Sequence, residues 1–171
     1  VFVYTGMGPQ WWAMGRELFK KEPVFRNAIE KCSIEFSKYT EWSLVEELMA
    51  DEKDSRMNET QISQPANFAI QVALTELWHS LGVRPDLIIG HSVGEVAAFY
   101  EAGVYNFEDA VKISFYRSKL QQKLAGKGTM VAVSLPEKEV VELLKDYEGR
   151  ISIAAINSNN SVTLAGDKES L

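Results

Sequence analysis

Cysteine and histidine are scarce in this sequence of 171 residues, which has one cysteine and two histidines. One cysteine cannot form an internal disulfide. Cys32 falls in a helical pattern of apolar residues, so we expect a small core side chain rather than a nucleophile. A reducing, cytoplasmic location is the expectation that follows. Two histidines and one cysteine without ligand spacing predict no metal site and no bound cofactor.

Positive charge and long apolar runs are also lacking. The net charge is −6 at pH 7 and the isoelectric point is about 5.0, which argues against nucleic acid as a partner. No apolar run approaches the ~20 residues that span a bilayer, so we expect no membrane partner. Residues 1–4 contain neither an initiator methionine nor the basic segment of a signal peptide. Both ends resemble interrupted elements, and we interpret the sequence as a fragment of a longer chain.

Apolar spacing predicts alternating strands and helices. Strands are expected at residues 1–4, 86–89, 130–135, 151–156 and 162–165, with 86–89 buried. Helices are expected up to about residue 38 and at residues 43–50, 65–81, 95–100, 107–124 and 137–147, with a loop at residues 51–60. Pro65 is expected near the first turn of its helix, and Gly82 at the end. From residue 127 the order strand, helix, strand, strand predicts part of a ferredoxin-like unit.

The segment Gly90-His91-Ser92-Val93-Gly94 carries the most chemical information. It follows the apolar run of residues 87–89 and precedes a predicted helix. A serine between two glycines at a strand-to-helix junction is the sequence form of a nucleophile elbow, where a tight turn leaves little room for flanking side chains. Free N–H groups at the helix start can stabilise an oxyanion. We therefore predict that Ser92 is the nucleophile of an acyl-transferring enzyme; a tight-turn serine is the alternative.

A serine hydroxyl needs a base to become a good nucleophile, and the sequence offers no convincing one. His91 adjoins Ser92, and neighbouring side chains at an elbow diverge. His79 is expected at the end of its helix, and Glu95 is expected to interact with the helix dipole. We predict that the general base lies outside these residues, so that the fragment alone has little or no activity.

Five segments in order resemble the motifs of malonyl-CoA:acyl-carrier-protein transacylases, the acyltransferase domains of fatty acid and polyketide synthases. Residues 90–95 resemble the GHSxGE motif. Gly6-Met7-Gly8-Pro9-Gln10 resembles the GQGxQ turn, with Met7 in place of a glutamine. Gln61-Ile62-Ser63-Gln64-Pro65-Ala66 resembles the glutamine-proline helix start. Tyr116-Arg117-Ser118 resembles the arginine segment, and Gly128-Thr129-Met130-Val131-Ala132-Val133 resembles the GxMxAV strand.

The resemblance implies an α/β fold in two parts. Residues 1–126 would form part of an α/β-hydrolase-like acyltransferase subdomain with the nucleophile elbow, and residues 127–171 part of a ferredoxin-like subdomain. It also implies that Ser92 takes a malonyl or methylmalonyl group from CoA and passes it to the phosphopantetheine thiol of an acyl carrier protein. The adjacent ketosynthase and other synthase domains would be further partners.

The same resemblance assigns roles to single residues. Arg117 would bind the free carboxylate of a malonyl group through a bidentate, charge-assisted pair, which a surface arginine with an acidic neighbour would not do. The N–H groups of Gln10 and Val93 would surround the oxyanion. Gln64 would order the pocket, unless it only caps its helix. We place His91 among the substrate-binding residues; a ring packed beside the turn is the alternative.

Two other functions remain open at this point. One is a different serine hydrolase, such as an esterase or a patatin-like lipase, that shares the elbow. The other is a non-catalytic fragment that docks carrier proteins. A carboxylate-binding Arg117 separates the first alternative from malonyl transfer, because an ester pocket has no use for it.

Overall fold

The computed structural model describes residues 1–147 and 149–171. The chain divides into two compact units, Val1–Gln122 and Lys123–Leu171, each with its own cluster of buried apolar side chains. The candidate nucleophile and its neighbours all belong to the first unit.

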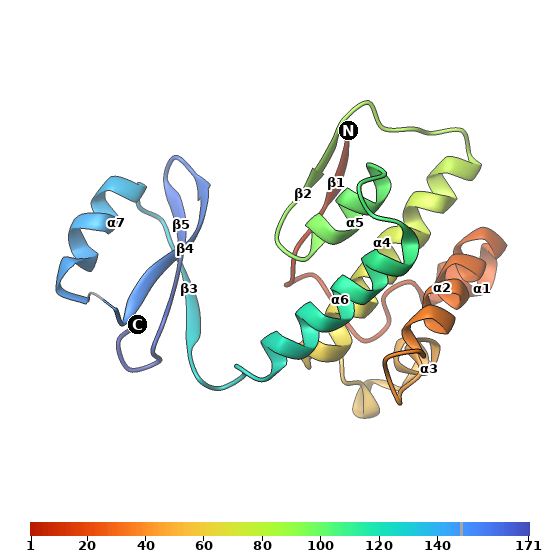
Figure 1. The fold of residues 1–171 in the computed structure, drawn as a ribbon, viewed down its shortest axis with the longest axis horizontal. Helices are drawn as coiled ribbons and strands as arrows, with labels where there is room; N and C mark the ends of the chain where they lie inside the picture. The colour runs from red at the N-terminus through yellow and green to blue at the C-terminus, as the bar shows by residue number, and fades with distance from the viewer. Residues whose placement is uncertain (148) are drawn as a thin grey trace. The chain divides into compact units, whose positions relative to one another are not determined.

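Helix α4 (Thr60–Ser80) is the central element of the first unit. Helices α2 (Pro23–Phe36) and α6 (Phe107–Gln122) pack against it, as does α5 (Gly94–Glu101), whereas α1 (Arg16–Lys21) packs on α2 (Figure 1). The short helices α3 (Leu44–Met49) and η1 (Glu52–Asp54) lie between α2 and α4 in the sequence. Apolar residues at helical spacing fill the core: Phe25, Ile29, Cys32, Phe36, Ile62, Phe68 and Val111. The prediction that Cys32 is a core residue is confirmed.

Two parallel strands complete the first unit. β1 (Phe2–Tyr4) pairs with β2 (Ile88–Gly90), with Phe2 opposite Ile88 and Tyr4 opposite Gly90 (Figure 1). The prediction of a buried strand here is wrong, because Ile89 is 47% exposed. Alternate side chains of a strand point to opposite faces of the sheet. Ile88 packs on the helical core, and Ile89 points away from it.

Helix α4 begins earlier than the sequence predicts. It starts at Thr60, so Pro65 lies inside it instead of near its first turn. A proline there removes one backbone hydrogen bond from the helix. Gln122 at the end of α6 accepts a hydrogen bond from the free N–H group of Gln61 (3.2 Å). This contact between distant segments cannot be seen in a local sequence pattern. The helix ends at Ser80, and Gly82 follows with φ 81°.

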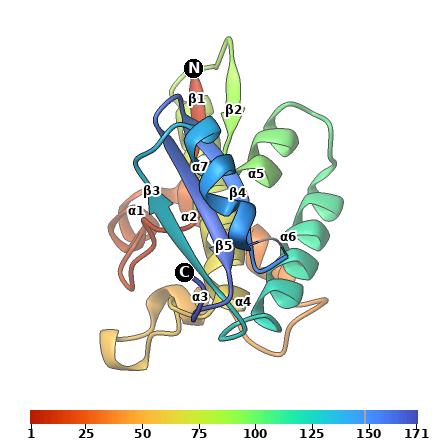
Figure 2. The same cartoon turned by 90° about the vertical axis from the view of Figure 1, so that its left-hand side faces the viewer.

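The second unit has one helix on a three-stranded antiparallel sheet. Its elements are β3 (Thr129–Val133), α7 (Glu137–Leu143), η2 (Leu144–Tyr147), β4 (Ile151–Ser158) and β5 (Ser161–Gly166), with strand order β3-β5-β4. Figure 2 shows α7 over one face of this sheet, where Val140 packs on Val162 and Leu164. The predicted order strand, helix, strand, strand is confirmed. Across the described parts of both units, no helix has the length and apolar character that crossing a membrane requires.

Candidate active site

Ser92 occupies a sharp turn between the end of β2 and the start of α5. Its φ is 54°, and among the described residues it is the one non-glycine residue with positive φ. A serine in this left-handed conformation is strained, and strain of this kind concentrates at functional sites. The side chain is exposed, one residue before the N-cap of α5. This is the geometry of a nucleophile elbow.

The glycines on either side of Ser92 are required by close backbone packing. A Cβ on Gly90 would lie 2.6 Å from Cα of Glu95, and a Cβ on Gly94 would lie 2.2 Å from the carbonyl oxygen of Tyr4. The atoms that it would strike belong to the backbone and cannot rotate away. The expectation that lack of room selects glycine at these two positions is confirmed.

Arg117 joins the elbow to the two long helices. From α6 its Nη2 donates to Oγ of Ser92 (3.2 Å), and its Nη1 donates to Oε1 of Gln64 on α4 (2.6 Å). Three residues that sequence reasoning selected separately therefore lie in one hydrogen-bonded chain. They come from three elements that are distant in the sequence.

The charge of Arg117 has no anionic partner in the part of the chain that the structure describes, where no carboxylate forms an ion pair with it. Burial lowers the pKa of its guanidinium, whereas the negative charge of Glu95 acts in the opposite direction. Its hydrogen-bond acceptors are neutral: a hydroxyl and side-chain amides. The surface-arginine alternative requires an ion pair with an acidic neighbour, and none of the ion pairs among the described residues includes Arg117.

Gln64 is the most buried member of this group, with 1% of its surface exposed. It lies within α4, so the alternative that it caps the helix is wrong. Its Nε2 donates to Oε1 of Gln121, which also accepts from Nη1 of Arg117 (3.3 Å). Gln121 belongs to none of the sequence motifs. Its position four residues after Arg117, on the same face of α6, is the signal that could have indicated it.

The turn after β1 lies against the elbow. A Cβ on Gly6 would be 3.2 Å from Cβ of Ser92. Further along the turn, Oε1 of Gln10 accepts a hydrogen bond from the N–H group of Gly8 (2.7 Å), which holds the turn in shape. Val93 is buried, and its N–H group donates to no protein acceptor within residues 1–147 and 149–171.

Met7 anchors the same turn to α4. Its sulfur lies 3.5 Å from Nδ2 of Asn67 and 3.8 Å from Oγ of Ser63, both of which are buried. A thioether is a weak hydrogen-bond acceptor, so this residue fills the place of the glutamine in the family motif without its full bonding capacity.

Neither histidine forms a hydrogen bond with Ser92 in the described part of the chain. The ring of His91 lies beside the turn, because a Cβ on Gly6 would be 3.0 Å from its Nδ1. His79 is held elsewhere: its Nε2 is 2.9 Å from Oε1 of Glu101, and its ring stacks on Phe2 with centroids 6.2 Å apart. Neither histidine is therefore placed to act as a general base on the candidate nucleophile.

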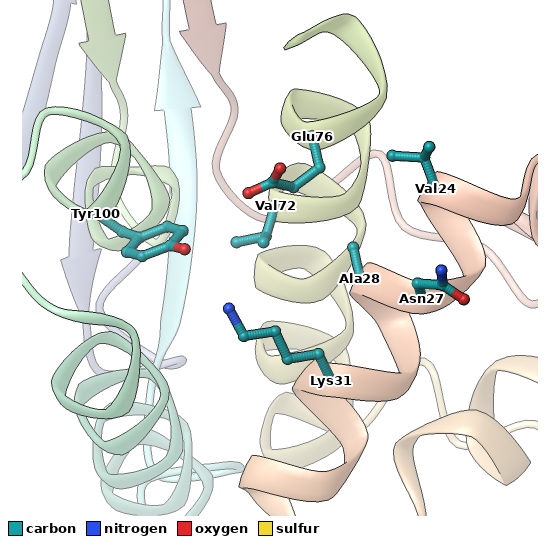
Figure 3. Close-up of a pocket in the computed structure, with 7 residues that line it drawn as sticks. All are labelled: Val24, Asn27, Ala28, Lys31, Val72, Glu76 and Tyr100. Atoms are coloured by element: carbon teal, nitrogen blue, oxygen red, sulfur yellow. The ribbon is translucent and has the colours of Figure 1, made fainter. Parts of the chain in front are cut away.

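A hollow of about 290 Å³ lies between α2, α4 and α5 (Figure 3). Its lining consists of Val24, Asn27, Ala28, Lys31, Val72, Glu76 and Tyr100. None of the predicted site residues is among them. The charged side chains of Lys31 and Glu76 reach this hollow from different helices, α2 and α4 (Figure 3). The reactive group around Ser92 is separate from this hollow.

Comparison with known proteins gives consistent matches along the chain. The family model of the acyl transferase domain matches residues 1–171. Squalestatin tetraketide synthase of Phoma sp. (strain C2932) is 40% identical over 172 residues, which cover 97% of this chain and 7% of that protein. The chain thus spans a small part of this relative.

Solved structures also match nearly the whole chain. The acyltransferase domain from module 8 of the salinomycin polyketide synthase has a TM-score of 0.92 and 37% identity, covering 98% of this chain and 40% of that one. A malonyl-transacylase in complex with a type II polyketide acyl-carrier protein has a TM-score of 0.84 and 28% identity, covering 98% and 55%. These matches confirm the predicted α/β fold.

Proposed function

This chain belongs to the acyl transferase domain family, and we propose that it moves a malonyl-type group from CoA to the phosphopantetheine thiol of an acyl carrier protein. Its relatives named above are a polyketide synthase, an acyltransferase domain of such a synthase, and a malonyl-transacylase. Polyketide biosynthesis is the setting that these relatives support. We also propose that residues 1–126 and 127–171 act as its two subdomains.

The observation that carries this proposal is that Arg117 lies beside Ser92 and forms no ion pair within the described residues. A half-buried guanidinium without an anionic partner attracts an anion, and its planar fork matches a carboxylate. A malonyl thioester brings a carboxylate close to its reacting carbonyl carbon. A plain ester or acetyl group has no such charge, so the arrangement favours a carboxylated acyl group over the substrates of an esterase or a lipase.

In the proposed mechanism, Oγ of Ser92 attacks the thioester carbonyl, and CoA leaves as its thiol once protonated. The carboxylate of the acyl group takes the donors of Arg117, so that Nη2 no longer needs Oγ of Ser92 as its acceptor. The N–H groups of Val93 and Gln10 stabilise the negative oxygen of the tetrahedral intermediate. His91, beside the turn, borders the bound acyl group.

The second half of the reaction repeats the first with a different thiol. The thiol of the phosphopantetheine arm attacks the acyl-serine ester, and Ser92 recovers its proton. A base must act in both halves, and we propose that it comes from residues outside this sequence, since neither His79 nor His91 contacts Oγ of Ser92. The substrate is malonyl-CoA or methylmalonyl-CoA, and the reaction as written needs no metal or other cofactor.

The proposed partner is an acyl carrier protein, which the complex of the related malonyl-transacylase supports. Adjacent ketosynthase and other synthase domains are further proposed partners, because the polyketide synthase relative is a far longer protein. A cytoplasmic location, expected from the single buried cysteine, stays a prediction.

Mass spectrometry of the loaded enzyme tests this function. An acyltransferase domain that includes these residues is mixed with malonyl-CoA, and the acylated peptide is identified. We expect a malonyl ester on Ser92 and none in the Ser92→Ala variant. Acylation at a different residue, or acetyl-CoA loading as readily as malonyl-CoA, would refute the proposal.

A further inference from the structure

Two adjacent glutamines at the end of α6, Gln121 and Gln122, both form hydrogen bonds with α4, but with different groups of that helix. Oε1 of Gln122 accepts from the backbone N–H group of Gln61 (3.2 Å). Oε1 of Gln121 accepts from the side chains of Gln64 and Arg117. The first contact fixes the start of a helix, whereas the second lies within the group that surrounds Ser92.

The side-chain amide of Gln64 can accept a hydrogen bond from Arg117 in only one of its two orientations. Its oxygen accepts from Nη1 of Arg117 (2.6 Å), so its NH₂ end points elsewhere and needs an acceptor of its own. Because Gln64 is 1% exposed, water is a poor substitute. Oε1 of Gln121 supplies that acceptor. If the amide were reversed, its NH₂ group would face the guanidinium, and both groups would be donors.

We propose that Gln121 is a positioning residue for acyl selection: it fixes the amide orientation of Gln64 and thereby holds Arg117 in place beside Ser92. The consequence for substrate choice rests on the proposed function, but the positioning itself does not. Gln121 also accepts from Nη1 of Arg117 (3.3 Å), so one oxygen restrains both partners. It acts on the substrate only through Arg117.

The positioning is tested first by NMR of the full chain, without any substrate. The observed signals are the Nε2 protons of Gln64 and the guanidinium protons of Arg117. In Gln121→Met, which keeps the length of the side chain and removes the acceptor, we expect the Gln64 protons to shift and to exchange faster with water. Gln122→Met is the matched control: it removes a hydrogen bond to the first turn of α4 but not the acceptor of Gln64, so it should shift these signals less than Gln121→Met does.

A second variant keeps the test decisive if Gln121→Met fails to fold. Gln121→Glu retains an acceptor oxygen at the same place, so it should preserve slow exchange of the Gln64 protons. Wild-type signals of Gln64 and Arg117 in folded Gln121→Met would overturn the proposal. Fast exchange of the Gln64 protons in Gln121→Glu would overturn it as well.

The consequence for selection is measured as the ratio of kcat/KM for malonyl-CoA to that for acetyl-CoA. For loss of one charge-assisted hydrogen bond we expect Gln121→Met to lower this ratio roughly tenfold, mainly through the KM for malonyl-CoA. Since Gln121 acts through Arg117, it should have no further effect in an Arg117→Ala background. Additive losses in the double variant, or an unchanged ratio in the single one, would contradict this role.

The two measurements separate the two claims. If the wild type transfers no acyl group to Ser92, the proposed function fails, and the NMR comparison still decides whether Gln121 positions Arg117. If transfer occurs and the NMR signals do not respond to Gln121→Met, the function stands and the positioning role is wrong.

Discussion

Nη2 of Arg117 lies 3.2 Å from Oγ of Ser92, although the two residues are 25 positions apart in the sequence. The contact places a permanent positive charge beside the hydroxyl that stands on the elbow. Gln64 holds the other arm of the guanidinium and is neutral, so it leaves the charge of Arg117 free for an anion. This relationship underlies the proposed preference for a carboxylated acyl group.

The strained backbone at Ser92 predicts that a residue which relieves the strain makes the fold more stable, although the function is lost. Ser92→Gly and Ser92→Ala both remove the proposed nucleophile, but only glycine adopts a φ of 54° without steric cost. We expect Ser92→Gly to be about 1 kcal/mol more stable than Ser92→Ala. Urea denaturation of the two variants measures the difference. Equal stabilities would mean that the turn is not strained.

The close packing at Gly94 predicts a large loss of stability in Gly94→Ala. The new methyl group would meet the carbonyl oxygen of Tyr4 at 2.2 Å, and either β1 or α5 would have to move. We expect a cost of about 2–3 kcal/mol in the free energy of unfolding. Gly103→Ala is the control: nothing lies within 4 Å of its new methyl group, so its cost comes from the φ of 74°, which Gly94 does not share. A loss no greater than that of the control would count against the close approach.

Part of the fold follows from local sequence patterns. Apolar spacing predicts α6, the β4–β5 hairpin and the elbow, because each depends on residues close together in the chain. The first turn of α4 donates a backbone hydrogen bond to Gln122 of α6, and the exposure of Ile89 depends on what covers the sheet. Both features depend on contacts between segments that are distant in the sequence, and the local spacing of apolar residues does not reveal such contacts.

The candidate site divides in the same way. Ser92 and the glycines around it belong to one continuous motif, and the family resemblance indicates Arg117 and Gln64. No motif includes Gln121, whose role depends on the end of α6 lying beside the first turns of α4. Met7 was visible as a departure from the family pattern, but its contacts with Ser63 and Asn67 were not.

Burial of Cys32 predicts an unreactive thiol. Removal from water raises its pKa to about 12, with the negative charge of Glu76 adding to the rise and Lys31 opposing it. We expect iodoacetamide at pH 8 to modify Cys32 in urea and to leave it intact in the folded chain. Rapid modification of the folded chain would show that the α2 core opens readily.

The same thiol makes stability depend on pH. Its folded pKa lies above the unfolded value of about 8.5, so the folded state keeps its proton longer. The stability that the protonated Cys32 thiol gives to the folded state is complete below the unfolded pKa and is lost as pH rises towards 12. Burial also raises the pKa of Tyr4 and of Tyr100. Their ionisation therefore adds to the loss of folded-state stability above pH 10, in the wild type and in the variant alike. Denaturation of Cys32→Ala should therefore show a shallower fall than the wild type between about pH 9 and 12.

Under the proposed function, Arg117 selects the acyl group that Ser92 accepts. The most direct measurement is competitive loading of an acyltransferase domain with malonyl-CoA and acetyl-CoA, in the wild type, Arg117→Lys and Arg117→Ala. Loss of the bidentate pair should reduce the malonyl-to-acetyl ratio on Ser92 by about 10- to 100-fold in Arg117→Ala. Arg117→Lys keeps the charge but not the fork, and we expect an intermediate ratio. A ratio in Arg117→Ala equal to that of the wild type would contradict the account.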